Sequence, residues 1–391
     1  MPDFIISVPR SNRIYRIAIG SLFFMLGLSF ATWASRIPSI QQALNLNDTT
    51  LGMALFALPV GSMISLPFTS WLIDRFGSKR VAANALFIYS LMLVLLGSVQ
   101  NLTQLLLVLV LFGAAGNTAN ISVNTQAVTI EARYGRNIMA SFHGLWSLAG
   151  FAAAGFGTLM IGENILPSRH FLLISSLIII GIAASFRYLL PDEKSDVKPR
   201  SLFVKPDRRL LVLGIIGFCC MICEGAMFDW SGIYFQRIVG AEKNWVGAGY
   251  TVFMFTMATG RFIADWVTFH LGFKKTVQYS GILIVTGLVL AIIFPYLLPA
   301  LVGFFLVGLG VSSVVPLIYS EAGKSKKMSP GSALAAVSSI SFLGFLVGPP
   351  LIGIIAGAFD LKISFALIAV MGFSIVFIAA IKNSRSSSET S

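Results

Sequence analysis

The chain has 391 residues, of which 56% are hydrophobic and 11% are charged. Soluble domains are roughly 45–50% apolar and about 25% charged, so this composition excludes an ordinary soluble protein and indicates a membrane protein. The formal net charge of +12 would suit nucleic-acid binding only if the cations were gathered on a polar domain, and the apolar stretches leave no room for a sizeable one.

Twelve apolar stretches follow one another along the chain. Each is close to the ~20 residues that a helix needs to cross a bilayer. Backbone groups in lipid must bond within their own segment, which favours helices over barrel strands. We therefore expect an all-α polytopic protein with twelve transmembrane helices, near residues 17–35, 50–73, 81–99, 103–130, 137–161, 169–190, 209–232, 245–268, 276–295, 297–322, 331–357 and 362–382.

The cations are distributed unevenly between the two ends of these spans. If the N-terminus is cytoplasmic, 22 of the 28 Lys and Arg residues lie on the cytoplasmic side. This asymmetry follows the positive-inside rule and predicts that both termini are cytoplasmic. It also favours contact with anionic lipids over any nucleic-acid role. No signal-peptide cleavage site precedes the first span, which we expect to stay uncleaved.

The longest charged stretch divides the spans into two sets of six. Residues 191–208 are polar and contain three prolines, which is typical of a linker along a membrane surface. We predict a six-helix bundle over 1–190, a cytoplasmic linker over 191–208, a second six-helix bundle over 209–382 and a disordered tail over 383–391.

The second half repeats the first at a spacing of 195 residues. The segment from Ser70 to Arg80 aligns with the segment from Asp265 to Lys275, and in each an apolar helix end leads to a glycine that is followed by two cations. The same shift pairs two further glycines in each half: Gly52 with Gly247, and Gly113 with Gly308. Two related halves in an apolar chain indicate a two-bundle transporter.

The loop Asp74-Arg75-Phe76-Gly77-Ser78-Lys79-Arg80 resembles the signature loop of the major facilitator superfamily. That signature runs glycine, three residues, aspartate, a cation, any residue, glycine and a basic cluster; here Ser70 and Ser78 replace its leading glycine and one cation. The second copy is more degenerate. The runs from Glu224 to Ser231 and from His143 to Leu148 are similar to a bacterial branch with fucose-permease-like members.

This resemblance implies the superfamily's fold of two pseudo-symmetric six-helix bundles, and it implies gating roles at the helix ends. The carboxylate of Asp74 can pair with a cation or a helix N-terminus, and Gly77 permits a sharp turn. We therefore expect a cytoplasmic latch at Asp74, Arg75, Gly77 and Arg80. Arg261 and Asp265, one helical turn apart, are a second candidate gate pair. The alternative is that both sets anchor helix ends at the lipid headgroups.

Carboxylates inside the predicted spans are the strongest candidates for proton coupling. A charge near the bilayer centre costs at least ~2.5–3.5 kcal/mol. Glu224 lies near the middle of the seventh span and Asp229 lies closer to its outer end. We predict that Glu224 takes up and releases a proton, and that Arg36 pairs with Asp229 or Glu224 in an outer gate. The alternative for Glu224 is a structural carboxyl. His143 is a further candidate because histidine titrates near neutral pH.

Polar and aromatic residues in the spans are candidates for solute contact. Asn117, Asn120 and Asn124 share one face of the fourth span, a helix that lines the central cavity in this superfamily. Such a face either binds solute or joins helices. The predicted solute-contact residues are Trp33, Arg36, Asn117, Asn120, Trp230 and Tyr319. The glycines and prolines of the eleventh span predict a packing seam.

The sequence contains no pattern that points to a cofactor, a metal or an enzyme. Cys219, Cys220 and Cys223 lie on one predicted helix without a histidine or carboxylate at zinc-like spacing. We therefore expect packing cysteines and no metal site. No nucleotide-binding glycine loop or catalytic constellation is present.

A secondary transporter accounts for the spans, the repeat, the loop and the intramembrane carboxylates together. We expect a monomeric, proton-coupled carrier of a small polar or amphipathic solute in a bacterial cytoplasmic (inner) membrane, working by alternating access. An efflux antiporter for drugs or metabolites and a receptor that does not transport remain the alternatives. The direction of transport stays open.

Overall fold

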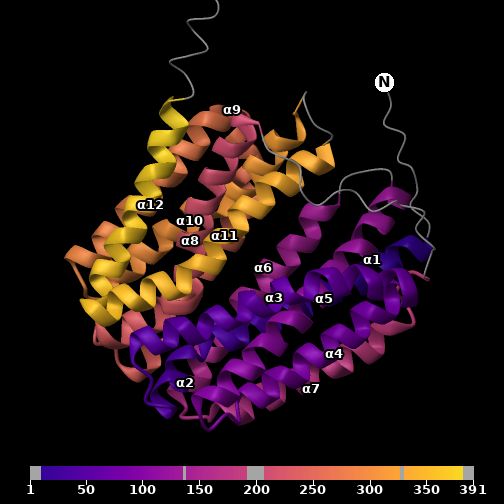
Figure 1. The fold of residues 1–391 in the computed structure, drawn as a ribbon, viewed down its shortest axis with the longest axis horizontal. Helices are drawn as coiled ribbons and strands as arrows, with labels where there is room; N and C mark the ends of the chain where they lie inside the picture. Colours follow the sequence, from indigo (N-terminus) through magenta and orange to yellow (C-terminus); the bar gives the residue numbers. More distant parts are fainter. Residues whose placement is uncertain (1–9, 135–137, 192–206, 326–329, 382–391) are drawn as a thin grey trace, which may run out of the picture. The chain divides into compact units, whose positions relative to one another are not determined.

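The computed structural model describes residues 10–134, 138–191, 207–325 and 330–381 (Figure 1). Within these ranges all regular elements are helices and no strand is present. The expected all-α fold is therefore confirmed. Most of the predicted linker and the whole predicted tail fall on 192–206 and 382–391, outside the described residues.

The first half of the chain forms a short helix in addition to its six predicted spans. The short helix α2 begins at Ile37 with a proline in its first turn, where a missing amide hydrogen removes no helical bond. The helices are α1 (Arg10–Ser35), α2 (Ile37–Ala43), α3 (Asp48–Phe76), α4 (Ser78–Leu96), α5 (Leu102–Tyr134), α6 (Met139–Gly162) and α7 (Pro167–Phe186).

In the second half, two predicted spans belong to one long helical element. Helix α9 contains both the eighth and the ninth span, with a break in helical geometry at Gly272. Among the described residues, eleven helices are long and apolar enough to cross a membrane. The elements are α8 (Arg208–Arg237), the 3-10 helix η1 (Lys243–Trp245), α9 (Ala248–Ile293), α10 (Leu297–Gly323), α11 (Pro330–Ala358) and α12 (Leu361–Ile381).

The backbone repeats at the same spacing as the sequence. Gly77 and Gly272, 195 residues apart, have φ/ψ of 81°/153° and 75°/159°. Asn45 and Gly240, also 195 apart, have φ of 50° and 64°. Residues other than glycine and asparagine rarely adopt positive φ. Equivalent turns in the two halves therefore share an uncommon backbone conformation.

Close helix packing also repeats. A Cβ atom on Gly113 of α5 would lie 1.9 Å from the Leu58 carbonyl oxygen of α3. A Cβ atom on Gly308 of α10 would lie 2.6 Å from the Phe253 carbonyl oxygen of α9. Both members of this second pair are 195 residues beyond those of the first. The predicted glycine pair therefore marks the same helix crossing in each half.

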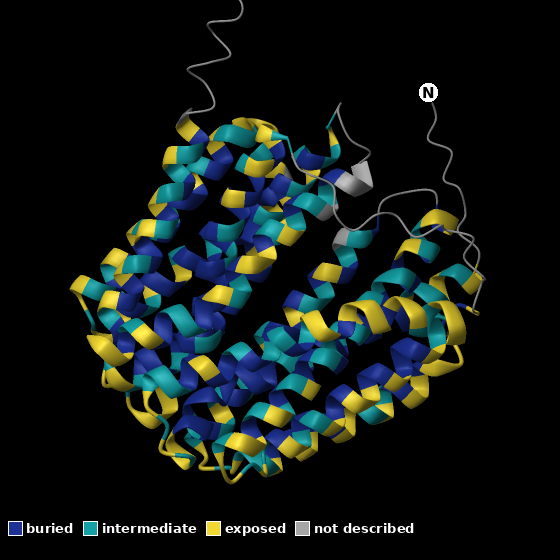
Figure 2. Ribbon diagram, in the orientation of Figure 1, coloured by how far each residue is buried: buried dark blue, intermediate teal, exposed yellow. Residues whose placement is uncertain are grey.

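The chain divides into two compact units. The first unit contains residues 1–33, 57–153 and 166–196, and the second contains 34–56, 154–165 and 197–391. The second unit thus includes α2, the start of α3 and the end of α6 as well as the whole second half. Buried residues gather where the helices of a unit face one another (Figure 2).

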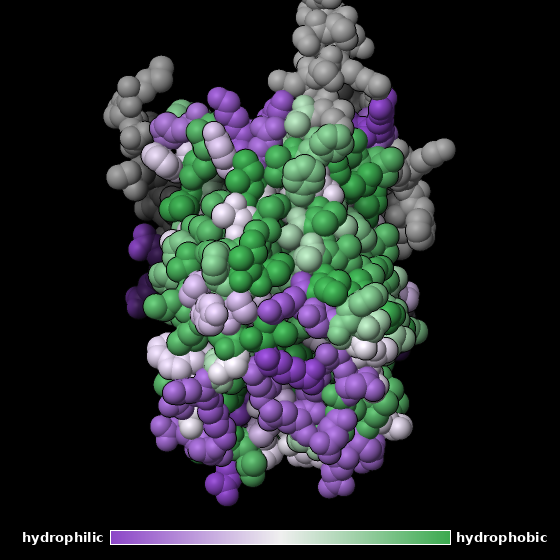
Figure 3. All heavy atoms as spheres, turned by 90° about the vertical axis from the view of Figure 1, so that its left-hand side faces the viewer, coloured by the Kyte–Doolittle hydropathy of each residue, from purple (hydrophilic) through white to green (hydrophobic). Residues whose placement is uncertain are grey.

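The outer surface carries many large apolar side chains. Phe269 is 86% exposed, and Ile17 and Leu298 are each 73% exposed. On the face seen in Figure 3, hydrophobic residues lie between ends that are richer in hydrophilic residues. Such a surface requires lipid rather than water around it. The protein is a multi-pass membrane protein.

Candidate functional site

Helix α8 is the most enclosed helix of the second unit. Its N-terminus is capped by Asp207, whose carboxylate accepts a hydrogen bond from the Leu210 amide at 2.9 Å. Most of its residues are buried, and it packs against α2, α9, α10, α11 and α12. The acidic residues within α8 are therefore surrounded mainly by protein.

Glu224 of α8 forms an ion pair inside the second unit. The Arg261 guanidinium of α9 donates to Glu224 Oε1 at 3.2 Å. The Glu224 side chain is 7% exposed and that of Arg261 is 22% exposed. A buried charge without compensation is far more costly than a paired one, so each side chain stabilises the other at this depth. The side chain of Asp265 lies outside the described part, and its pairing with Arg261 stays a prediction.

Tyr319 extends the polar cluster around Glu224. It lies near Glu224, and its hydroxyl forms a hydrogen bond with Ser338 of α11. Side chains from α8, α9, α10 and α11 thus meet at one place. The sequence predicted roles for Glu224, Arg261 and Tyr319 separately, and the structure brings the three together.

The cysteines of α8 pack against neighbouring helices. The Cys220 thiol donates to the Val311 carbonyl oxygen at 3.8 Å, and the Cys223 thiol donates to the Ile368 carbonyl oxygen at 3.6 Å. All three cysteines are buried and free. In the part of the chain that the structure describes, no group of three His, Cys, Asp or Glu side chains could hold a metal ion.

Asp229 differs from Glu224 although it lies on the same helix. It is half-buried, and its carboxylate makes no hydrogen bond or ion pair with the residues that the structure describes. The predicted partner Arg36 is buried, and its guanidinium donates to the Ile165 carbonyl oxygen at 2.6 Å. Burial lowers the pKa of Arg36 to about 10, so it remains charged at neutral pH. We predicted that Arg36 pairs with Asp229 or Glu224. In the structure, Glu224 pairs with Arg261 instead.

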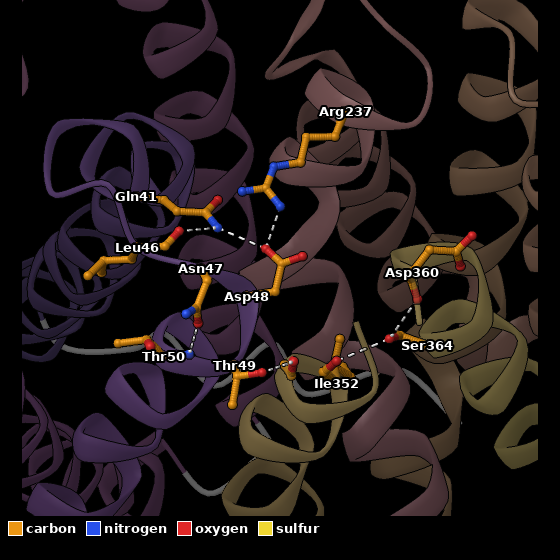
Figure 4. A network of polar contacts seen from close by, with 11 residues as sticks. Gln41, Leu46, Asn47, Asp48, Thr49, Thr50, Arg237, Ile352, Asp360 and Ser364 are labelled. Carbon is orange, nitrogen blue, oxygen red and sulfur yellow. Dashed lines mark hydrogen bonds and ion pairs between the residues drawn. The ribbon is translucent and has the colours of Figure 1, made fainter. Parts of the chain in front are cut away.

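A polar network joins the start of α3 to the end of α8 (Figure 4). Arg237 Nη1 donates to Asp48 Oδ1 at 2.5 Å, and Gln41 Nε2 donates to the same oxygen at 2.9 Å. The Asn47 side chain accepts from the Thr50 amide at 2.8 Å and so caps α3. We call this end of the second unit, where α8 and α6 end and α3 and α9 begin, the distal end.

Two helix crossings at the distal end are related by the repeat. A Cβ atom on Gly52 of α3 would lie 2.8 Å from Gly353 Cα of α11, and one on Gly247 at the start of α9 would lie 2.3 Å from Thr158 Oγ1 of α6. Gly247 and Gly353 are each 195 residues beyond Gly52 and Thr158. The two crossings are therefore counterparts, but only one includes a side chain. Thr158 Oγ1 also forms a hydrogen bond with Thr251 Oγ1 at 3.0 Å.

The asparagines of α5, in the first unit, separate into two groups. Asn117 Nδ2 donates to the Ser62 carbonyl oxygen at 3.1 Å and to Ser65 Oγ at 2.9 Å, which joins α5 to α3. Asn120 is exposed and accepts a hydrogen bond at Oδ1 from Asn124 Nδ2 at 3.0 Å. Asn117 therefore makes helix contacts, whereas Asn120 presents an amide to its surroundings.

The signature loop makes the predicted turn, with Gly77 between α3 and α4. Asp74, Arg75 and Arg80 are exposed. The Asp74 carboxylate has no hydrogen bond or ion pair to any residue in the described ranges, whereas Arg75 lies 5.5 Å from the centre of the Trp71 ring. The predicted latch at these residues stays a prediction.

The remaining predicted site residues lie in contrasting surroundings. Trp33 and Trp230 are 1% and 0% exposed, and neither indole N–H finds an acceptor among the described residues. They are packing residues in this conformation. His143 of α6 is exposed, and its ring meets that of Phe23 edge-on at 5.3 Å.

Comparison with known proteins identifies the family. Residues 17–327 match the model of the Major Facilitator Superfamily. The chain belongs to this superfamily. It is a membrane transporter and not an enzyme.

This transporter has relatives in sequence and in fold. It is 32% identical over 351 residues to an uncharacterised MFS-type transporter of Yersinia pestis, covering 89% of this chain and 91% of the relative. A mutant of the nucleoside transporter NupG has a TM-score of 0.79 at 12% identity, covering 94% and 99% of the two chains. FucP in the outward conformation has a TM-score of 0.65 at 17% identity, covering 96% and 100%. These structural likenesses show the fold.

The structure of the transporter adds polar anchors that sequence reasoning missed. Glu131 of α5 accepts hydrogen bonds from the Ile138 and Met139 amides, each at 2.7 Å, and caps the start of α6. Buried Gln126 bonds the backbone of Leu190 in both directions, at 2.9 and 3.3 Å. Both residues lie in the last third of the α5 sequence, where polar residues interrupt an apolar run. That interruption is the signal that could have found them.

Proposed function

We propose that this protein is a proton-linked secondary transporter that moves a small polar or amphipathic solute across a bacterial cytoplasmic membrane by alternating access. Both termini would be cytoplasmic, as the positive-inside asymmetry suggests. The single observation that carries the proton linkage is the Glu224–Arg261 ion pair within the membrane-spanning part of the second unit.

The ion pair offers a physical basis for coupling. A proton on Glu224 removes its charge and weakens its attraction to Arg261, so the contact between α8 and α9 changes in strength with each proton taken up. Tyr319 and Cys220 lie near Glu224 and belong to the same polar cluster. A contact whose strength depends on one proton can bias two conformations of the carrier.

The distal end would form one of the two gates. The crossings at Gly52 and Gly247, the Asp48–Arg237 pair and the Arg36 contact with Ile165 all close this end of the second unit. Alternating access requires these contacts to separate in another conformation. In that conformation we expect the signature loop at Asp74, which has no partner among the described residues, to form its latch.

Asn120 supports a polar solute path through the first unit. An amide exposed to hydrocarbon without hydrogen bonds costs several kcal/mol, so the exposed Asn120–Asn124 pair suits an aqueous path rather than lipid. Asn117, Trp33, Trp230 and Tyr319 would contact solute only after their present packing changes.

The test uses purified protein in liposomes that contain a pH-sensitive dye. A panel of solutes is added outside, and solute-dependent proton flux is expected for the transported class. The Glu224→Gln variant keeps the size of the side chain but removes its charge, and it should lose this flux. Replacing exposed Glu163 with Gln is the matched control and should leave the flux unchanged.

The outcomes separate the function classes. Unchanged proton flux in Glu224→Gln would remove the coupling role from Glu224. Absence of flux with any solute of a broad panel, in protein that still binds one of them, would favour a receptor.

A further inference from the structure

Two acidic residues of α8, five positions apart, differ in how their charge is compensated. Glu224 is paired with Arg261 at 3.2 Å. Asp229 is half-buried, and its carboxylate has no hydrogen bond or ion pair to the residues described in the structure. The chain itself therefore provides a partner for one carboxylate and leaves the other available.

The positions of α8 one turn to either side of Asp229 face apolar and aromatic side chains. On the same face of α8, one turn before Asp229, Gly225 faces the Phe345 ring, with 3.2 Å between that ring and a Cβ atom on the glycine. One turn after Asp229, a Cβ atom on Gly232 would lie 2.6 Å from the Pro38 side chain. Phe228 stacks on Phe345 at 6.0 Å between ring centroids. The positions one turn before and one turn after Asp229 thus face an aromatic ring and a proline ring.

An unpaired carboxylate in such surroundings is costly. On insertion scales an aspartate costs ~2.5–3.5 kcal/mol at the centre of a membrane helix, and less toward the end where Asp229 lies. A cationic ligand would remove this cost by forming a charge-assisted contact with the carboxylate, and neighbouring aromatic rings add further attraction for an ammonium group. An anionic ligand would raise the cost.

We propose that Asp229 binds the cationic group of an organic ammonium solute, and that a proton and the solute compete for this one carboxylate. The inference rests on the proposed proton-linked transport and names its solute class. The solute displaces the proton from the carboxyl oxygen to water and takes its place as an ion pair, with no covalent bond to the nitrogen. Because the carboxylate holds only one of the two, the coupled exchange is antiport.

The helices packed against α8 leave Asp229 as the group for this exchange. Arg261 is engaged with Glu224, and α2 and α11 contain no titratable side chain. The charged or titratable side chains of the surrounding elements nearest in the chain to the outer half of α8 are Arg36 before α2, Tyr250 of α9, Tyr319 of α10, and Asp360 and Lys362 at the start of α12. His270, Lys274, Lys275 and Tyr279 follow Arg261 on α9, and Glu321 of α10 pairs with Arg209 at the start of α8.

The experiment measures binding and proton release together in purified full-length protein. The probes are choline, benzyltrimethylammonium and tetraethylammonium, and 3,3-dimethylbutan-1-ol is the uncharged counterpart of choline. At least one cation should raise the thermal unfolding temperature and release a proton into weakly buffered detergent solution. In Asp229→Asn, affinity should fall at least about tenfold and proton release should disappear.

Two further variants keep the test decisive. Asp229→Glu retains a carboxylate and should still exchange a proton for the cation, and the exposed control Glu163→Gln should match wild type. Cation binding that persists in Asp229→Asn, or an uncharged counterpart that binds as well as choline, would overturn the assignment, as would the failure of all three cations to bind.

Failure of this site and failure of the proposed function give different results. Proton flux driven by uncharged solutes, lost in Glu224→Gln and intact in Asp229→Asn, would leave the transport proposal standing and remove the cation site. Cation binding that releases a proton in detergent, without any flux in liposomes, would leave the cation site standing and remove the transport proposal.

Discussion

The two helix crossings at the distal end of the second unit occupy equivalent positions in the repeat, but different groups make contact at each. At the α3–α11 crossing, Gly52 meets Gly353, so main chain packs on main chain. At the α9–α6 crossing, Gly247 meets the side chain of Thr158, which also bonds Thr251. The repeat therefore preserves where helices cross, while the residues at each crossing have diverged. The first crossing depends on the absence of side chains, and the second depends on one hydroxyl.

The largest effect is expected at the main-chain crossing. In Gly52→Ala the new Cβ atom would lie 2.6 Å from the Pro349 carbonyl oxygen and 2.8 Å from Gly353 Cα, and neither atom can move without shifting a helix. We expect the free energy of unfolding in detergent to fall by about 1–3 kcal/mol. Thermal unfolding of the purified variant measures this. A variant as stable as wild type would show that the crossing is looser than described.

The counterpart crossing should tolerate the same change better. In Gly247→Ala the closest atom is Thr158 Oγ1 at 2.3 Å, which can rotate away at the cost of its bond to Thr251. We expect a loss of about 1 kcal/mol, the size of one hydrogen bond.

Adding Thr158→Ala to Gly247→Ala should recover part of this loss, because the two residues are in contact. A double-mutant cycle on thermal unfolding gives their interaction energy. Strictly additive effects would contradict the described contact.

The ion pair beside the first crossing should contribute less. Asp48→Asn retains an acceptor for Gln41 but removes the charge that Arg237 faces, and the Arg237 side chain is 44% exposed. We expect a loss of about 0.2–1 kcal/mol at low salt and a smaller one at high salt. Unfolding at two ionic strengths tests this, and a loss independent of salt would argue against an ionic contribution.

The smallest effect on stability is expected at a turn where the equivalent residues of the two halves both have positive φ. Gly240 has a φ of 64°, and a Cβ atom added there would meet nothing within 4 Å; its counterpart Asn45 has a φ of 50°. Gly240→Asn should therefore change stability by only a few tenths of a kcal/mol, whereas Gly240→Val should cost about 1–2 kcal/mol. Thermal unfolding of both variants compares the two costs. Equal effects of the two substitutions would show that the turn can change conformation.

The elements of this fold follow from local sequence, and so they were predictable. A run of apolar residues such as that of α4 specifies a span without reference to the rest of the chain. The glycine turns at Gly77 and Gly272 were visible because each lies between an apolar run and a pair of cations. The repeat spacing then predicted that the two turns are counterparts.

The contacts of the candidate site depend on helix packing, and so they were not predictable. Arg261 lies 37 positions after Glu224, and only the packing of α9 against α8 brings them together. Asn117 illustrates the same limit. Its spacing indicated a polar face, but only the position of α3 decides that its amide bonds Ser62 and Ser65.

The turns at Gly77 and Gly272 have a mechanical consequence. A single residue connects α3 to α4, and a single residue separates the two arms of α9. Such a connection contains no slack, so the two helices on either side cannot slide past each other along their axes. The two helix ends that meet at Gly77, and the two that meet at Gly272, must therefore shift together.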